Sequence, residues 1–95
     1  MKIIVVCGNG LGTSLMMEMS IKSIVKDLGV KADVDHVDLG SAKGTDCDIF
    51  VGTKDIAEQL IAQKVEGKIV SLDNMIDKVA MKERMSAALQ ELGAL

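Results

Sequence analysis

A cysteine followed by a glycine-rich turn is the part of this sequence most suited to chemistry. Cys7 ends a run of five apolar residues that starts at Ile3, and glycines at positions 8, 10 and 12 precede Thr13 and Ser14. Such a run predicts a buried parallel strand, and a helical pattern begins near Ser14. The thiol is therefore expected at the carboxyl end of a strand, under backbone N–H groups and a helix N-terminus. Such a site binds dianionic phosphate and favours a thiolate, which predicts a phosphate-carrying cysteine.

Other phosphate-binding motifs match this segment less well. A Walker A loop needs Gly-Lys-Ser/Thr after its glycines, and a dinucleotide fingerprint needs one more residue before its last glycine. A cysteine phosphatase needs an arginine six residues after its cysteine, and Thr13 stands there. That arginine clamps the phosphoryl oxygens in the transition state and contributes a factor of roughly 10³ or more. Without it a phosphocysteine hydrolyses slowly, as a phosphoryl carrier requires.

Three alternatives to a carrier stay open at this point. In the first alternative the chain is a stand-alone thiol enzyme related to low-molecular-weight phosphatases or arsenate reductases. In the second it is a regulatory module that binds phosphate or a partner without catalysing a reaction. In the third alternative Cys7 is a small buried hydrophobe, and the glycines serve only the turn.

The remaining candidate residues carry weaker signals. Cys47 is predicted at the amino end of the third strand, far from Cys7, as a structural residue and not as a redox partner. One histidine and two dispersed cysteines do not match metal-ligand spacing, so neither a metal nor another cofactor is expected. His36 is interpreted as a solvated side chain at a strand end, and a role at the edge of the Cys7 site stays open for it. Met16 and Met19 are either flexible core residues or an adaptable docking surface beside the loop.

Strands and helices alternate along the chain. Strands are predicted at 3–6, 32–37, 47–51 and 68–72, with helices at 15–28, after Thr53 and after 73 or 74. One helical turn is possible within 38–46. This alternation predicts one α/β domain, 1–95, with a four-stranded parallel sheet in the order 2-1-3-4 and helices on both faces, a three-layer sandwich like that of phosphatase-loop proteins. The thiol loop then lies at the switch point between strands one and three. The predicted inward-facing residues include Leu15, Ile61 and Val79.

Composition restricts the function further. The net charge of −3 argues against nucleic-acid binding, and a single aromatic residue, Phe50, provides no stacking platform. The apolar runs are too short to span a bilayer, and no signal-peptide pattern is present. We therefore expect a soluble cytoplasmic protein without direct membrane insertion, which handles a small group or docks on other proteins.

The segment from Cys7 to Ser14 resembles the loop of enzyme IIB components of the bacterial phosphotransferase system (PTS), of the ascorbate/galactitol type and closest to the L-ascorbate branch. The resemblance implies a phosphotransferase in sugar uptake. A IIA component would donate a phosphoryl group from phosphohistidine, Cys7 would accept it as the nucleophile, and a sugar bound in the membrane IIC transporter would receive it. The implied phosphate-binding loop consists of Gly8, Asn9, Gly10, Leu11, Gly12, Thr13 and Ser14.

Overall fold

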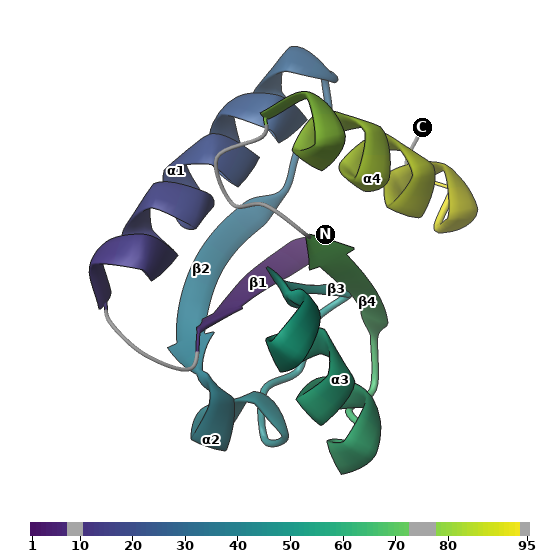
Figure 1. The fold of residues 1–95 in the computed structure, drawn as a ribbon. Coiled ribbons are helices and arrows are strands. Elements are labelled where there is room, and N and C mark those ends of the chain that lie inside the picture. Colours follow the sequence, from purple (N-terminus) through teal and green to yellow (C-terminus); the bar gives the residue numbers. More distant parts are fainter. Residues whose placement is uncertain (8–10, 73–77, 94–95) are drawn as a thin grey trace.

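A four-stranded parallel sheet in the order β2-β1-β3-β4 forms the middle layer of the structure, with helices on both of its faces (Figure 1). The computed structural model describes residues 1–7, 11–72 and 78–93, and of the side chains it leaves out those of residues 7 and 11–14. This architecture and strand order confirm the fold predicted from the alternating pattern. The elements are β1 (Lys2–Cys7), α1 (Leu11–Asp27), β2 (Asp33–Asp38), α2 (Leu39–Ala42), β3 (Ile49–Thr53), α3 (Lys54–Gln63), β4 (Lys68–Leu72) and α4 (Lys78–Glu91).

β1 is an interior strand with partners on both sides. Its register with β2 runs from Lys2 opposite Asp33 to Cys7 opposite Asp38, and Ile3 also pairs with Ile49 of β3. The side chains of residues 3–6 are all buried, because alternate residues face the two helical layers. The carboxyl end of β1 therefore lies where the chain switches from one side of the sheet to the other.

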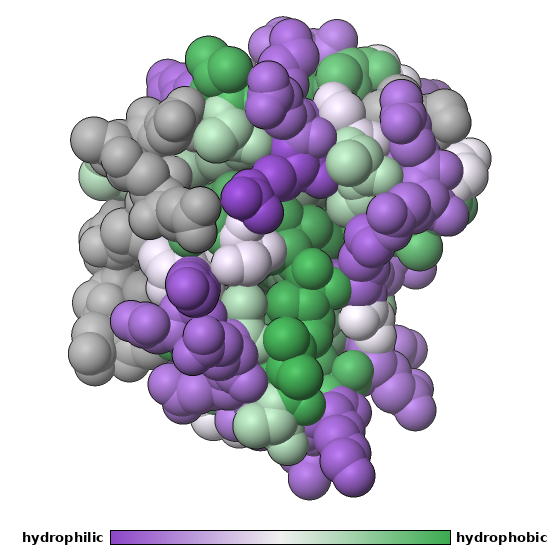
Figure 2. Space-filling view, turned by 45° about the vertical axis from the view of Figure 1, so that its right-hand side comes forward, coloured by the Kyte–Doolittle hydropathy of each residue, from purple (hydrophilic) through white to green (hydrophobic). Residues whose placement is uncertain are grey.

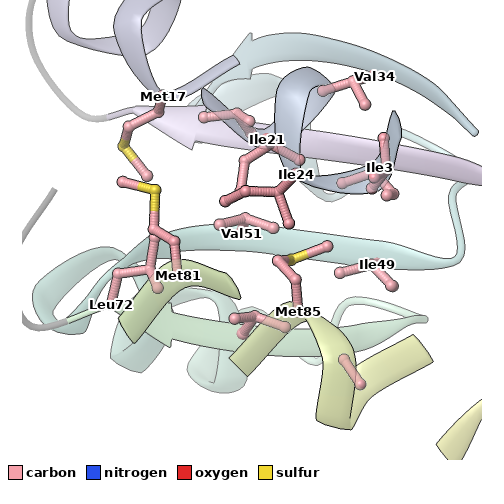
Figure 3. Packing of buried hydrophobic residues seen from close by; sticks show 14 of the residues in the cluster. Ile3, Met17, Ile21, Ile24, Val34, Ile49, Val51, Leu72, Met81 and Met85 are labelled. Carbon is pink, nitrogen blue, oxygen red and sulfur yellow. The ribbon is translucent and has the colours of Figure 1, made fainter. Parts of the chain in front are cut away.

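The larger hydrophobic core lies between the sheet and the pair of helices α1 and α4. Met17 of α1 and Met81 of α4 point toward one another beside Val51 of β3 (Figure 3). Both methionine side chains are almost fully buried. A smaller core, which contains Phe50 and Leu60, lies between the other face of the sheet and helices α2 and α3. The domain thus has two cores that share the sheet.

Three residues predicted to face the core are exposed instead, namely Leu15, Ile61 and Val79. Each helix contains more apolar residues than one buried stripe can hold, so the sequence alone did not show which of them turn outward. In α4 the buried stripe consists of Met81, Met85, Ala88 and Leu89.

Several element boundaries also differ from the predicted ones. α1 begins at Leu11, before Ser14, and β3 begins at Ile49, so Cys47 precedes the strand. The segment between β2 and β3 does contain a short helix, α2. Gly29 ends α1 with a positive φ of 74°, as a helix C-terminal glycine does. The predicted cap at Asp73 or Asn74 lies outside the described residues.

β4 forms one edge of the sheet. On this side of the molecule, Figure 2 shows a band of hydrophobic residues with hydrophilic residues on both sides. An ion pair between Lys68 of β4 and Glu91 of α4 joins this edge to the helix above it. Among the described residues, no helix combines the length and the apolar character needed to cross a membrane.

Candidate functional site

The structure places the backbone of Cys7 where the sequence predicted it. Cys7 is the last residue of β1, and α1 begins four residues later at Leu11. The N-terminus of a 17-residue helix therefore follows the strand end directly, and its free N–H groups make this edge favourable for an anion. Gly8, Asn9 and Gly10 lie outside the described residues, and so do the side chains of Cys7, Leu11, Thr13 and Ser14, whereas Gly12 lies in the described backbone of α1.

A second strand-to-helix junction lies beside this strand end. β3 ends at Thr53 and α3 starts at Lys54. A β-carbon on Gly52 would lie 2.8 Å from Cγ2 of Ile56 and 3.4 Å from the carbonyl oxygen of Val6. Gly52 therefore permits the close approach of α3 to the end of β1. Sequence reasoning gave Gly52 no steric role, because a close approach between two chain segments has no local signal.

Asp38 is the residue paired with Cys7 across the strands. Its carboxylate accepts a hydrogen bond of 2.7 Å from the backbone N–H of Ser41 and so caps α2. This carboxylate is engaged at the helix terminus. The cap also fixes the path of the chain as it leaves β2, at the same edge of the sheet as Cys7.

Next to β1, α1 and β2 bring three ionisable side chains together. Nδ1 of His36 lies 3.3 Å from Oε1 of the buried Glu18 and 3.7 Å from Oδ1 of Asp35. The Lys22 ammonium lies 4.0 Å from the other oxygen of Glu18. Because an unpaired buried carboxylate is costly, these partners explain how Glu18 is tolerated beneath the helix.

This cluster was not predicted. Sequence reasoning treated His36 as a solvated side chain and found no metal-ligand spacing. In the part of the chain that the structure describes, the ligand atoms of Glu18, Asp35 and His36 lie within 4.8 Å of one another, a spacing that a metal ion can use. Glu18 is distant in sequence from Asp35 and His36, and only the packing of α1 on β2 brings it to them.

Cys47 lies beside the amino ends of the strands, whereas Cys7 lies at their carboxyl ends. Cys47 comes two residues before Ile49, which pairs with Ile3 of β1. Because the strand from Ile3 to Cys7 spans roughly 13 Å, Cys7 and Cys47 are too far apart to form a disulfide. The Cys47 thiol donates a 3.3 Å hydrogen bond to the carbonyl of Ile49. Burial, with the nearby Asp48 carboxylate, raises the pKa of this thiol to about 11. Cys47 is therefore protonated at neutral pH, as expected of a structural residue.

The methionines of α1 separate into two groups. Met17 is 2% exposed and lies in the core, whereas Met16 is 63% and Met19 70% exposed. These exposures exclude the interpretation of Met16 and Met19 as core residues. The sequence left both interpretations open, since 16, 17 and 19 cannot all lie on one face of a helix.

Comparison with known proteins identifies the family. Residues 2–87 match the family described as the PTS system, Lactose/Cellobiose specific IIB subunit. The chain is 32% identical over 89 residues to the ascorbate-specific PTS system EIIB component of Mycoplasma pneumoniae, covering 92% of this chain and 93% of that protein.

Two solved structures share the fold. The lactose-specific IIB domain of Streptococcus pneumoniae matches with a TM-score of 0.65 and 18% identity, over 97% of this chain and 93% of that one. A low-molecular-weight protein tyrosine phosphatase from Bacillus subtilis matches with a TM-score of 0.55 and 14% identity, over 96% and 98% of the two chains. The fold is thus shared with a phosphatase, while the family match and the relative at 32% identity agree on the function. The chain belongs to the PTS IIB family, the phosphoryl carriers of sugar phosphotransferase systems.

Proposed function

We propose that Cys7 is the residue that carries the phosphoryl group. The observation that supports this most directly is its position as the last residue of β1, four residues before the N-terminus of α1. The Cys7 thiolate attacks the phosphorus of a phosphohistidine on the IIA component. The S–P bond forms as the P–N bond breaks, and the imidazole leaves. IIB proteins work with IIA and IIC partners in general.

In the second step a sugar hydroxyl attacks the phosphocysteine while the sugar is bound in the membrane IIC transporter. The O–P bond forms, the S–P bond breaks, the hydroxyl proton passes to a base of the transporter or to solvent, and the thiolate is regenerated. The protein acts on the cytoplasmic side, where both partners reach it. Backbone N–H groups from Gly8 to Ser14 surround the phosphoryl oxygens, and the Thr13 and Ser14 hydroxyls add donors.

L-Ascorbate is the proposed sugar. The Mycoplasma relative is named ascorbate-specific, and the loop from Cys7 to Ser14 resembles that branch. The solved lactose-specific IIB domain is only 18% identical and supports the fold alone. Uptake and phosphorylation of labelled ascorbate by a reconstituted system, with lactose and cellobiose as comparison sugars, tests this assignment.

The carrier role is tested by comparing Cys7→Ser with Cys47→Ser. Each protein is incubated with phosphoenolpyruvate, the general phosphotransferase proteins and the cognate IIA component, and its mass is then measured. We expect wild type and Cys47→Ser to gain one phosphoryl group and Cys7→Ser to gain none. The reason is that the Cys47 thiol is protonated and lies near the amino ends of the strands, away from Cys7. Labelling of the Cys7 variant would refute the assignment.

The same experiment separates a carrier from a phosphatase. After the donor is removed, the phosphorylated wild type should keep its phosphoryl group long enough to pass it on, because Thr13 stands where a phosphatase has its arginine. Rapid release of inorganic phosphate by the protein alone would favour the phosphatase reading.

A further inference from the structure

Helix α1 exposes three long apolar side chains within five residues of its N-terminal half. Leu15 is 45%, Met16 63% and Met19 70% exposed, although Met17 between them is buried. Residues 15 and 19, and also 16 and 19, are neighbours on a helix surface, so the three make one continuous surface. Scattered exposed apolar residues need no explanation, but a continuous group of large ones marks a contact site.

This surface lies close to the proposed phosphoryl-transfer site. α1 begins four residues after Cys7, and its rise per residue places Met16 roughly 8 Å and Met19 roughly 12 Å along the helix from Leu11. A standard protein interface covers roughly 800 Å² on each partner, a patch of about 16 Å radius if circular. A protein that docks over the end of β1 therefore covers the start of α1 as well.

We propose that Leu15, Met16 and Met19 form the docking surface for the IIA phosphoryl donor, an inference that rests on the proposed role of Cys7. Transfer requires the phosphohistidine and the thiolate to be held in line, so two folded surfaces must be kept in register around Cys7. Methionine side chains are unbranched and adaptable, and they fit a partner surface without a fixed shape.

The charges around this surface indicate the polarity of the donor. The charged residues of α1 are Glu18, Lys22, Lys26 and Asp27. Glu18 is buried against His36, whereas both lysines are exposed. Lys22 and Lys26 lie three and seven residues after Met19 and continue its exposed face of α1, although Lys22 also lies 4.0 Å from Glu18 and Asp27 follows Lys26. We expect a complementary donor surface with an apolar centre and an acidic rim.

The test is a double variant, Met16→Gln with Met19→Gln, which keeps side-chain length and helix propensity. Ile61→Gln is the matched control, because Ile61 is 63% exposed like Met16 but lies on α3, on the other face of the sheet. The initial rate of phosphoryl transfer is measured against the concentration of phosphorylated IIA. We expect the KM for IIA to rise about tenfold or more in the double variant, with kcat nearly unchanged. The control should match wild type.

Thiol alkylation and circular dichroism accompany the kinetics. An unchanged iodoacetamide rate at Cys7 and an unchanged spectrum, together with the raised KM, support a docking role. An unchanged KM, with wild type still accepting the phosphoryl group, overturns the docking surface and leaves the carrier role standing. A defect confined to transfer onward to IIC, or a wild-type dimer that the double variant abolishes, also overturns it, because another partner then occupies the surface. A wild type that accepts nothing overturns both proposals.

Discussion

At the scale of single residues, the two cysteines occupy different places in the fold. Cys7 ends a strand shortly before a helix begins, whereas Cys47 is half-buried beside Asp48, and its thiol donates a hydrogen bond to the carbonyl of Ile49. Burial and a neighbouring carboxylate both disfavour a thiolate, and the pKa of Cys47 rises to about 11. Because the thiolate is the nucleophile, the raised pKa of Cys47 disfavours this residue as a phosphoryl acceptor and leaves Cys7 as the proposed one.

The raised pKa of Cys47 predicts a pH-dependent contribution to stability. An unfolded thiol has a pKa of ~8.5, so the folded protein holds this proton more firmly. The contribution is fully present below the unfolded value and is lost as the pH rises through the folded one. We expect the stability advantage of wild type over Cys47→Ala to be constant up to about pH 8 and to shrink toward about pH 11. Urea unfolding of both proteins measures it, and a constant difference would contradict the prediction.

At the scale of elements, the junction between β3 and α3 depends on a missing side chain. A β-carbon on Gly52 would lie 2.8 Å from Cγ2 of Ile56, so a substitution there must push α3 away from the sheet. Gly52→Ala should reduce the free energy of unfolding by roughly 1–3 kcal/mol, the usual cost of overpacking. Chemical denaturation of the purified variant measures this cost.

Gly44→Ala, in the segment between α2 and β3, provides the control for Gly52→Ala. A β-carbon there would meet only the carbonyl oxygen of Ser41 at 4.0 Å, an ordinary contact. We expect Gly44→Ala to change stability by less than about 1 kcal/mol in either direction. Equal costs for the two substitutions would show that the approach of Ile56 to Gly52 does not constrain the junction.

At the scale of the whole molecule, one face of α1 packs into the core and the opposite face is exposed to solvent. Met17 packs toward Met81 of α4, and thereby joins the helix that follows Cys7 to the C-terminal helix (Figure 3). Met17→Ala should cost about 2–5 kcal/mol of stability, because it leaves a cavity between the helices. Met19→Ala, the same change two residues away, should stay within about 0.5 kcal/mol. Thermal unfolding of the two variants separates core from surface, and similar midpoints would contradict this division.

Much of the fold could be predicted from local patterns. Alternating strand and helix patterns indicated a parallel sheet, and the alternation of apolar and charged residues over 32–37 indicated a strand at an edge, where β2 lies. Gly29 marked the end of α1, and Lys68–Leu72 was predicted with its observed bounds. These features depend on residue periodicity and on the conformational freedom of glycine, which a single chain segment displays by itself.

The tertiary structure decided which apolar residues face inward and which distant residues meet. Leu15, Ile61 and Val79 point outward because each buried stripe was already filled by other apolar residues. The contact between Glu18 and His36 exists only because α1 packs on β2. The position of Cys7 at the end of a strand that precedes a helix could be predicted because its signal lies in consecutive residues. The sequence left open whether Met16 and Met19 are buried or exposed. The partners of Glu18 could not be predicted, because contacts between distant segments leave no periodic trace in the sequence.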